Sequence, residues 1–255
     1  MKLVLAIVRR QKIVDIIQDK KKVLVQELAA NFSVTEETIR RDLEKLEKKG
    51  IVTRIFGGAM LNVANQYEGI HYYKRATIHL EEKRKMAKIF KDILNQKRTI
   101  LADSSTTVME VMKLLDDSIQ RCVVTNSAVA LQELANKDLI INSTGGTFNK
   151  NTLSLQGKIT KDTIKRFNVD ILLISCKGIC MEKGIMDSNE VEAEVKQEMG
   201  KQAQEIALFV DHTKFNKTAL VHMYDWDEID YLITDEKPDE KWIEFCNEHK
   251  IKLMY

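Results

Sequence analysis

Small, hydroxyl-bearing and ionisable residues recur in this 255-residue chain directly after predicted β-strands. The five segments are 103–107, 126–127, 143–146, 175–178 and 211–214. Any one of them alone is more typical of a helix cap or a turn than of a binding site. Their repetition at successive strand ends instead predicts one shared ligand site, because the carboxyl ends of parallel strands meet at the same edge of a sheet.

The first of these segments has the composition of an anion-binding loop. It consists of Asp103, Ser104, Ser105, Thr106 and Thr107 and joins a predicted strand to a predicted helix. The first turn of a helix offers free N–H groups and the positive end of the helix dipole, both of which stabilise an anion. We expect Lys214, with Lys177 as a further candidate, to add charge-assisted hydrogen bonds.

A second group of polar side chains lies on one face of a predicted helix. Ile39, Leu43 and Leu46 recur at helical spacing as its buried stripe, and Thr35 is its expected N-cap. The opposite face carries Thr38, Arg40, Arg41 and Lys45. Arginine binds guanine edges in bidentate fashion and cations bind phosphates, so this face suits the major groove of DNA. A merely solvated amphipathic helix is the alternative interpretation.

The residues that follow this helix favour the DNA-binding interpretation. Residues 51–60 predict a β-hairpin in which Gly57 and Gly58 permit a tight turn or a close backbone approach. A hairpin directly after a recognition helix is a wing. We expect Arg54 on this wing to reach the DNA backbone.

Two different folds are needed to position these two groups of residues. The first 60 residues predict helices and a hairpin, a small α+β winged helix-turn-helix domain. From residue 81 onward, predicted helices alternate with short apolar strands. The helices are 81–95, 107–115, 128–135 and 190–204, and the strands are 99–102, 122–125, 139–142, 169–176, 207–210 and 231–234. Such apolar runs are typical of buried parallel strands, so we predict an α/β domain with a mainly parallel sheet.

The charge distribution agrees with this division. Residues 1–60 hold 13 Lys and Arg against 8 Asp and Glu, a net charge of +5, and the remaining residues hold 27 against 30, a net charge of −3. A basic unit joined to an acidic one suggests that the first contacts nucleic acid. We predict a DNA-binding domain at 1–60, a connector at 61–80 and an effector-sensing domain at 81–255. Aromatic and basic residues of the connector could stack on nucleic acid, but we favour packing between the domains.

Composition argues against several other classes of protein. No apolar run approaches the roughly 18–20 residues of a membrane helix, and no signal peptide is recognisable. The four cysteines form no CxxC pair. We therefore expect a cytoplasmic protein with reduced thiols, no metal site and no membrane partner.

Residues 9–60 resemble the DNA-binding domain of the DeoR family of bacterial transcriptional repressors. The resemblance is carried by Thr38-Ile39-Arg40-Arg41-Asp42-Leu43, then Leu46, Gly50, and Arg54 through Gly57-Gly58-Ala59. It implies double-stranded operator DNA as a partner. Because two-fold proteins read paired half-sites, we also expect a dimer or tetramer.

The α/β domain is similar to the effector domain of the same family, which shares its fold with ribose-5-phosphate isomerase and glucosamine-6-phosphate deaminase. The matching residues are Asp103 with Ser104 to Thr107, Thr125-Asn126-Ser127, Gly145-Gly146, Gly157, Gly178, Gly184, Asn189-Glu190, Glu192, Lys196, and Asp211 through Lys214-Phe215. The resemblance implies a sugar phosphate as effector and no cofactor. We expect Asp103, Asp187, Glu190 and Asp211 to accept hydrogen bonds from the hydroxyls of the sugar. Lys177 and Asp187-Ser188 depart from the family pattern, and we expect them to select the particular ligand.

These observations predict a ligand-controlled DNA-binding regulator, a repressor of a sugar-metabolism operon. The alternative is a phosphosugar isomerase or deaminase, because the sheet and its carboxylates permit one. An isomerase, however, has no need of a DNA-binding module.

Overall fold

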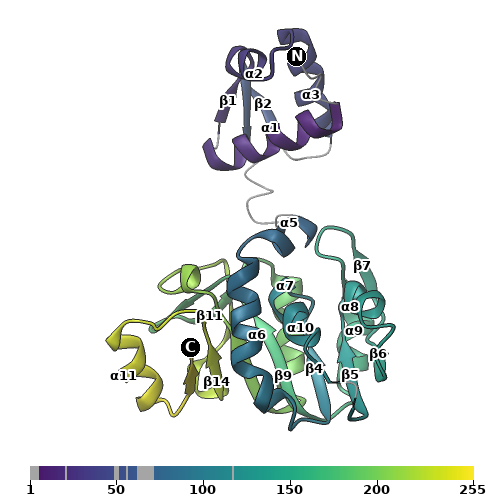
Figure 1. The fold of residues 1–255 in the computed structure, drawn as a ribbon, viewed down its shortest axis with the longest axis vertical. Coiled ribbons are helices and arrows are strands. Elements are labelled where there is room, and N and C mark those ends of the chain that lie inside the picture. Colours follow the sequence, from purple (N-terminus) through teal and green to yellow (C-terminus); the bar gives the residue numbers. More distant parts are fainter. Residues whose placement is uncertain (1–5, 21, 49–51, 56, 62–71, 117) are drawn as a thin grey trace. The chain divides into compact units, whose positions relative to one another are not determined.

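The computed structural model describes residues 6–20, 22–48, 52–55, 57–61, 72–116 and 118–255. It divides into two compact units, Met1–Gly69 and Ile70–Tyr255, each described here by itself (Figure 1). The division falls inside the predicted connector 61–80. Residues 62–71 of that connector and Gly50 lie outside the described part of the chain, and the connector's last residues form a helix and the start of another.

The described residues of the first unit form three helices and a small sheet, as predicted for a winged helix-turn-helix domain. Its elements are α1 (Ala6–Lys20), β1 (Lys22–Leu24), α2 (Val25–Phe32), α3 (Glu36–Lys48), β2 (Val52–Ile55) and β3 (Gly58–Leu61). Ile39 and Leu43 of α3 pack with Ile13 and Ile17 of α1 in one buried core. The Thr38 N–H donates to the Thr35 hydroxyl at 3.3 Å, which agrees with the predicted N-cap.

The wing is an antiparallel hairpin of β2 and β3, and β1 completes the sheet in the order β1-β3-β2. Gly57 has a φ of +75°, which most side chains disfavour. Gly58 lies so close to β1 that a Cβ atom there would collide with the Val23 carbonyl. The two glycines therefore serve the tight turn and the close approach that the sequence predicts.

The second unit is built on a seven-stranded parallel sheet in the order β15-β14-β12-β9-β4-β5-β6. Its helices are α5 (Tyr72–Thr77), α6 (Leu80–Leu94), α7 (Thr106–Met112), α8 (Ala128–Glu133), α9 (Lys158–Ile164), α10 (Glu190–Gly200) and α11 (Glu240–Glu248). The sheet strands are β4 (Thr99–Ala102), β5 (Arg121–Thr125), β6 (Leu139–Ser143), β9 (Val169–Ser175), β12 (Ala203–Phe209), β14 (Tyr231–Ile233) and β15 (Lys252–Met254).

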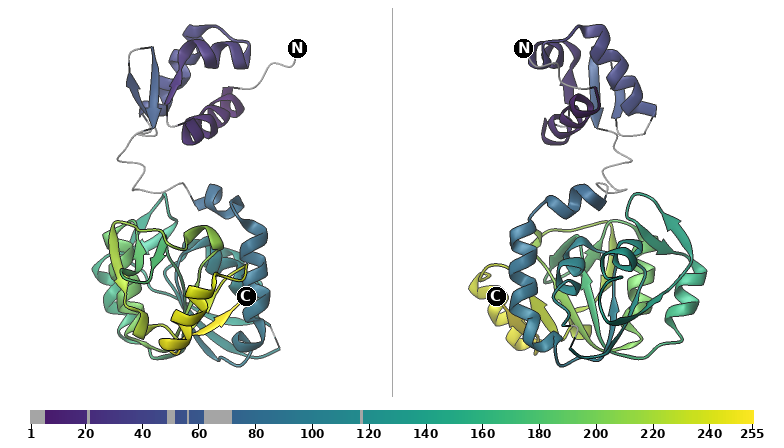
Figure 2. Two further views of the ribbon diagram at one scale, coloured as in Figure 1. Left: turned by 90° about the vertical axis from the view of Figure 1, so that its left-hand side faces the viewer. Right: turned by 45° about the vertical axis from the view of Figure 1, so that its right-hand side comes forward.

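Helices cover both faces of this sheet, which explains why its strands are apolar throughout. In β9, Ile171 and Leu173 face a core shared with α6, α7 and α8. Leu172 and Ile174 face the opposite core, shared with α9, α10 and α11. The layers can be followed in Figure 1 and, from two other sides, in Figure 2. The predicted fold class is confirmed: a helix-turn-helix domain followed by an α/β domain with a parallel sheet.

Smaller elements of the second unit escape the sequence pattern. They are the antiparallel sheet of β10 (Gly178–Cys180), β11 (Gly184–Asp187) and β13 (Val221–Tyr224), the hairpin of β7 (Thr147–Asn149) and β8 (Ser154–Gln156), and the one-turn helices η1 (His212–Lys214) and η2 (Trp226–Glu228). The predicted helix 190–204 is too long. It ends at Gly200, and the chain enters β12 at Ala203, where pairing with Val169 of β9 fixes an extended backbone.

Among the described residues, no helix is long and apolar enough to cross a membrane.

Candidate functional site

A cavity of about 220 Å³ opens where β4, β9 and β12 end. These three strands are neighbours in the sheet, so the segments that follow them meet at its carboxyl edge. The residues that line the cavity are Arg75, Ile78, His79, Lys83, Ser104, Ser105, Thr106, Thr107, Ser175, Cys176, Lys177, Asp187, Glu192, Lys196, Asp211, Thr213 and Lys214. We refer to this cavity as the pocket.

Eight of the residues predicted to bind an effector line the pocket. They are Ser104, Ser105, Thr106, Thr107, Lys177, Asp187, Asp211 and Lys214. The Ser105 hydroxyl also caps α7, accepting from the Val108 N–H at 3.1 Å. Ser105 therefore acts as a helix cap, the alternative to a binding role, and also lies in the wall of the pocket.

The other six predicted residues do not line the pocket. Asp103 lies behind it and accepts from the Ser105 and Ser175 N–H groups at 2.8 and 3.1 Å. Asn126 donates to the Leu155 carbonyl at 3.1 Å, and Ser127 caps α8. Both follow β5, which is one strand further along the sheet.

Gly145 and Gly146 follow β6, two strands away from β4, and serve the packing of α9. The Gly145 carbonyl accepts from the Thr160 hydroxyl at 2.6 Å. At Gly146, where φ is +113°, a Cβ atom would collide with that hydroxyl. Glu190 is exposed in the first turn of α10, while Glu192, two residues later, lines the pocket.

The buried ammonium of Lys196 organises one wall of the pocket. Its Nζ lies 2.7 Å from an Asp187 carboxylate oxygen and 3.2 Å from one of Asp103, and it donates to the Ser175 carbonyl at 2.7 Å. Burial acts to lower the pKa of Lys196, but Asp187 and Asp103 outweigh it and raise the pKa above its usual range. Three strand ends are therefore held together by one charged group.

Lys214 forms a second ion pair on the wall contributed by η1. Its Nζ lies 3.2 Å from an Asp211 carboxylate oxygen and 3.2 Å from the Ser175 hydroxyl. Burial acts to raise the pKa of Asp211, but the Lys214 ammonium and hydrogen bonds outweigh it and lower the pKa. Asp211 therefore remains a carboxylate that can accept hydrogen bonds from a ligand.

Two further lysines that line the pocket have lowered pKa values. Burial lowers the pKa of Lys177 to about 8, with the Arg75 guanidinium as the next cause. Burial also lowers the pKa of Lys83 to about 8, with the Lys214 ammonium as the next cause. Within the described part of the chain, the Lys177 ammonium makes no hydrogen bond or ion pair, so it is available to a ligand.

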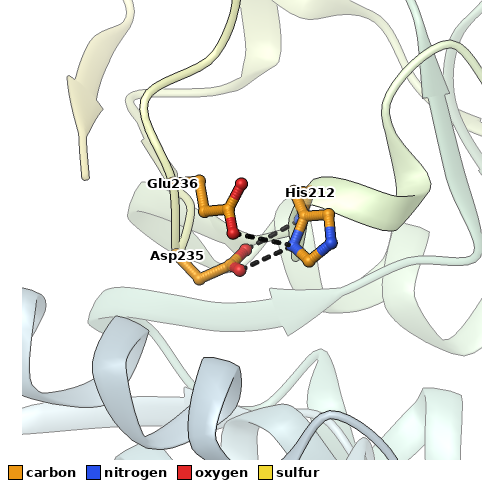
Figure 3. A group of neighbouring side chains, drawn as sticks. All are labelled: His212, Asp235 and Glu236. Carbon is orange, nitrogen blue, oxygen red and sulfur yellow. Dashed lines mark hydrogen bonds and ion pairs between the residues drawn. The ribbon is translucent and has the colours of Figure 1, made fainter.

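His212, Asp235 and Glu236 form a group beside η1 whose composition would permit a metal ion (Figure 3). Asp235 already accepts from both the His212 backbone N–H and the His212 ring nitrogen Nδ1, each at 2.7 Å. The Asp235 side chain raises the pKa of His212. These contacts give the group a structural role, because they hold η1, which contains Lys214, in place.

Sequence reasoning missed the contribution of α5 and α6 to the pocket. Arg75, Ile78, His79 and Lys83 all line it, yet they lie in or beside the predicted connector. They follow no strand and match no strand-end pattern. Thr213, which also lines the pocket, lies between two predicted residues.

The first unit presents the predicted polar side chains on α3 and directly before it; all are exposed except Thr38, which is half-buried. We refer to Thr35, Thr38, Arg40, Arg41 and Lys45 as the α3 face. Arg40 pairs with Glu36 at 2.5 Å and Arg41 with Glu37 at 3.2 Å, both within the same helix. The Thr35 and Thr38 hydroxyls lie 2.8 Å apart.

Asp42 fixes the orientation of this helix from its buried side. Its carboxylate oxygens lie 2.6 Å from the Arg9 and 3.0 Å from the Arg10 guanidinium, which ties α3 to α1. A hollow of about 380 Å³ next to α3 is lined by Arg40, Arg54, Gly57 and Gly58 among others. Arg40 of the α3 face therefore borders one concave surface with the predicted wing residues, while Thr35, Thr38, Arg41 and Lys45 do not line it.

Comparisons with known proteins match both units to one family. Residues 9–64 match the DeoR-like helix-turn-helix domain, and residues 78–236 match the DeoR C-terminal sensor domain. Together the two matches cover most of the chain.

Full-length relatives agree. The uncharacterized HTH-type transcriptional regulator YulB of Bacillus subtilis is 35% identical over 246 residues, 96% of this chain and 95% of that protein. The L-fucose operon activator of Haemophilus influenzae is 31% identical, covering 96% and 98%. The glycerol-3-phosphate regulon repressor of Escherichia coli is 28% identical, covering 96% and 97%. These relatives are regulators and not enzymes, which decides against the isomerase alternative. The chain belongs to the DeoR family of DNA-binding transcriptional regulators.

Proposed function

We propose that this regulator is a repressor of a sugar-metabolism operon and that a phosphorylated sugar bound in the pocket controls its affinity for operator DNA. The observation that carries the proposal is the pocket itself. It combines the Lys177 ammonium, which has no partner among the described residues, with the cations of Arg75, Lys83, Lys196 and Lys214 and a set of hydroxyls at the carboxyl edge of a parallel sheet.

The charges of the pocket suit a phosphate group. Lys177 and Lys214 supply ammonium groups, and hydrogen bonds between a cation and a phosphate are among the stronger ones in proteins. The hydroxyls of Ser104, Thr106 and Thr107 add neutral donors. A volume of about 220 Å³ is below the roughly 300–1,000 Å³ of sites for drug-sized molecules, which favours a small ligand.

The carboxylates of the pocket suit the rest of a sugar. Asp187, Asp211 and Glu192 line it, and ionised carboxylates accept hydrogen bonds from hydroxyl groups. Asp187 and Asp211 both have lowered pKa values, so they stay ionised at neutral pH. The relative in E. coli is named for glycerol 3-phosphate, a small phosphorylated polyol. That name supports the same ligand class here.

For the DNA interface, we propose that the α3 face enters the major groove while Arg54, Gly57 and Gly58 of the wing approach the phosphate backbone. An operator with repeated half-sites requires at least a dimer, and we propose a homodimer or tetramer. Because bacterial operator DNA lies in the cytoplasm, we propose that the protein is cytoplasmic.

A thermal-shift screen tests the ligand. Each sugar phosphate is compared with the same sugar lacking the phosphate, using the full chain. We expect one phosphorylated sugar to raise the melting temperature, since a ligand at about 100 times its Kd adds about 2.7 kcal/mol to stability. Equal shifts from the unphosphorylated sugar, or no shift from any sugar phosphate, would contradict the proposal.

A gel shift with that ligand tests the regulation. For a repressor released by its effector, we expect the ligand to weaken operator binding. The relative in H. influenzae is named an activator, so a ligand that strengthens binding would reverse the proposed direction while keeping the ligand site. Operator affinity that stays unchanged at every ligand concentration would exclude the control mechanism.

A further inference from the structure

The short helix α5 forms part of the pocket wall. Arg75 lies on α5, Ile78 and His79 follow it, and all three line the pocket. In the sequence, α5 is the first described element after residues 62–71, which lead back to the DNA-binding unit. Contacts that hold α5 in place therefore fix the sensor unit at the end of the chain that leads to the DNA-binding unit.

Lys83 of α6 binds the end of α5 from inside the pocket. Its Nζ donates to the Arg75 carbonyl at 2.5 Å and to the Ile78 carbonyl at 2.6 Å, and only 5% of the residue is exposed. Carbonyl groups at the end of a helix lack partners within the helix and carry partial negative charge. Among the described residues no carboxylate forms an ion pair with Lys83, so the two carbonyls are its hydrogen-bond acceptors, while the charges of Asp211 and Glu110 favour its ammonium from further away.

The opposite end of α5 is held by a separate contact. Tyr72 is buried, and its N–H donates to the Asn151 carbonyl at 2.9 Å. A helix of six residues is not stable on its own, because helices shorter than about 12 residues are marginal in water. Its order therefore depends on contacts with the rest of the sensor unit, among them those at Tyr72 and at Lys83.

Two other cations lie close enough to the Lys83 ammonium to repel it. The Lys214 ammonium and the Arg75 guanidinium both help to lower the pKa of Lys83, which means that their charges repel its ammonium; the Asp211 and Glu110 carboxylates act in the opposite direction but do not restore the usual pKa. An anion in the pocket would offset this repulsion and favour the charged form of Lys83. It would thereby strengthen the hydrogen bonds to the Arg75 carbonyl of α5 and to the Ile78 carbonyl just after it.

We propose that Lys83 is a positioning residue that couples the pocket to α5: an anion in the pocket locks α5 onto α6 through Lys83, with Arg75 as the second cation. The inference rests on the proposed function only in that the pocket binds an anionic ligand. It adds the element that responds to the ligand.

Hydrogen–deuterium exchange of the full chain tests this inference, with inorganic phosphate as the probe and chloride at matched ionic strength as the reference. We expect phosphate to slow exchange of the amides of residues 75–79 at least three-fold, while amides of β12 change less. Lys83→Met, measured at a phosphate concentration that saturates its own thermal shift, should lose the slowing. Lys83→Arg should restore it, since a guanidinium can also donate to two carbonyls.

Lys88→Met is the matched control, because Lys88 lies exposed on the same helix; it should behave as the parent does. If Lys83→Met does not fold, Arg75→Gln at saturating phosphate replaces it, and a smaller slowing is expected. Slowing in Lys83→Met or Arg75→Gln that equals the parent's would overturn the inference. So would a parent whose melting temperature rises with phosphate while exchange at α5 stays the same; that result would leave the proposed function standing. A parent stabilised by neither phosphate nor any sugar phosphate would overturn both.

Discussion

The α3 face and the pocket both gather positive charge, but they hold it in opposite ways. On the α3 face, the side chains of Arg40 and Arg41 are 50% and 73% exposed and pair with glutamates one turn away on the same helix. In the pocket, the Lys196 side chain is 10% exposed and its partner Asp187 only 1%. Its partners come from segments far apart in the sequence.

This difference separates a surface that can exchange partners from a site that is built in advance. Exposed ion pairs contribute about 0–1 kcal/mol, so Arg40 and Arg41 can leave their glutamates for a DNA phosphate or a guanine edge at little cost. A buried pair is costly to break, because the remaining charge loses its partner in a poorly solvated place. The wall of the pocket that Lys196 holds together is therefore fixed by its buried ion pairs.

The largest expected effect is that of Lys196→Met. The change leaves Asp187 and Asp103 buried without their cation, and breaking such a group costs roughly 3–5 kcal/mol. Denaturant unfolding of the full chain measures it. The control is Lys201→Met, which removes an exposed lysine from a 3.5 Å pair with Glu198 and should cost under about 1 kcal/mol. Equal losses in the two variants would erase the contrast between buried and exposed charge.

The next effect is that of Arg41→Ala on operator binding. Loss of a base or phosphate contact costs roughly 1–3 kcal/mol, or about 5- to 150-fold in affinity. The melting temperature should stay close to the parent's, because the Arg41 side chain is mostly exposed. Lys12→Ala on α1 removes the same charge from another exposed position and serves as the control in salt-matched gel shifts. Parent-like binding by both Arg40→Ala and Arg41→Ala would refute the assignment of the α3 face.

The smallest effect concerns Lys177 and pH. Its pKa is lowered to about 8 in the free protein, and a bound anion favours the protonated form. Ligand binding should therefore take up a proton near pH 8, and affinity should fall as the pH rises from 7 to 9. Calorimetry in buffers of different ionisation enthalpy measures the uptake. Lys83, with its pKa also lowered to about 8, contributes in the same direction.

Lys177→Met should reduce both quantities. We expect roughly 10-fold weaker binding or more, from about 1.5–3 kcal/mol for a hydrogen bond to a charged group, and a smaller proton uptake. Lys183→Met, an exposed change in the same segment, should alter neither. An unchanged proton uptake in Lys177→Met would show that its ammonium does not face the ligand.

Local patterns were enough to predict the α3 face and the wing. The N-cap at Thr35, the apolar stripe of α3 and the glycines of the turn are all properties of residues within one turn or one hairpin. The strands of the large sheet were predictable for a similar reason, since burial on both faces demands continuous apolar runs. Helix 190–204 was predicted too long because pairing of Ala203 with β9 is a tertiary contact.

The sequence by itself determined which segments follow strands and which charges they carry. Only the tertiary structure decided which of those segments share a pocket, because that depends on the order of strands in the sheet. β12, β9 and β4 are neighbours, so Asp211, Lys177 and Ser104 meet, whereas the ends of β5 and β6 lie further along the sheet. The place of α5 and Lys83 at the pocket also depends on tertiary structure, because the spacing of apolar residues in the sequence does not predict a hydrogen bond from a lysine to carbonyls of another segment.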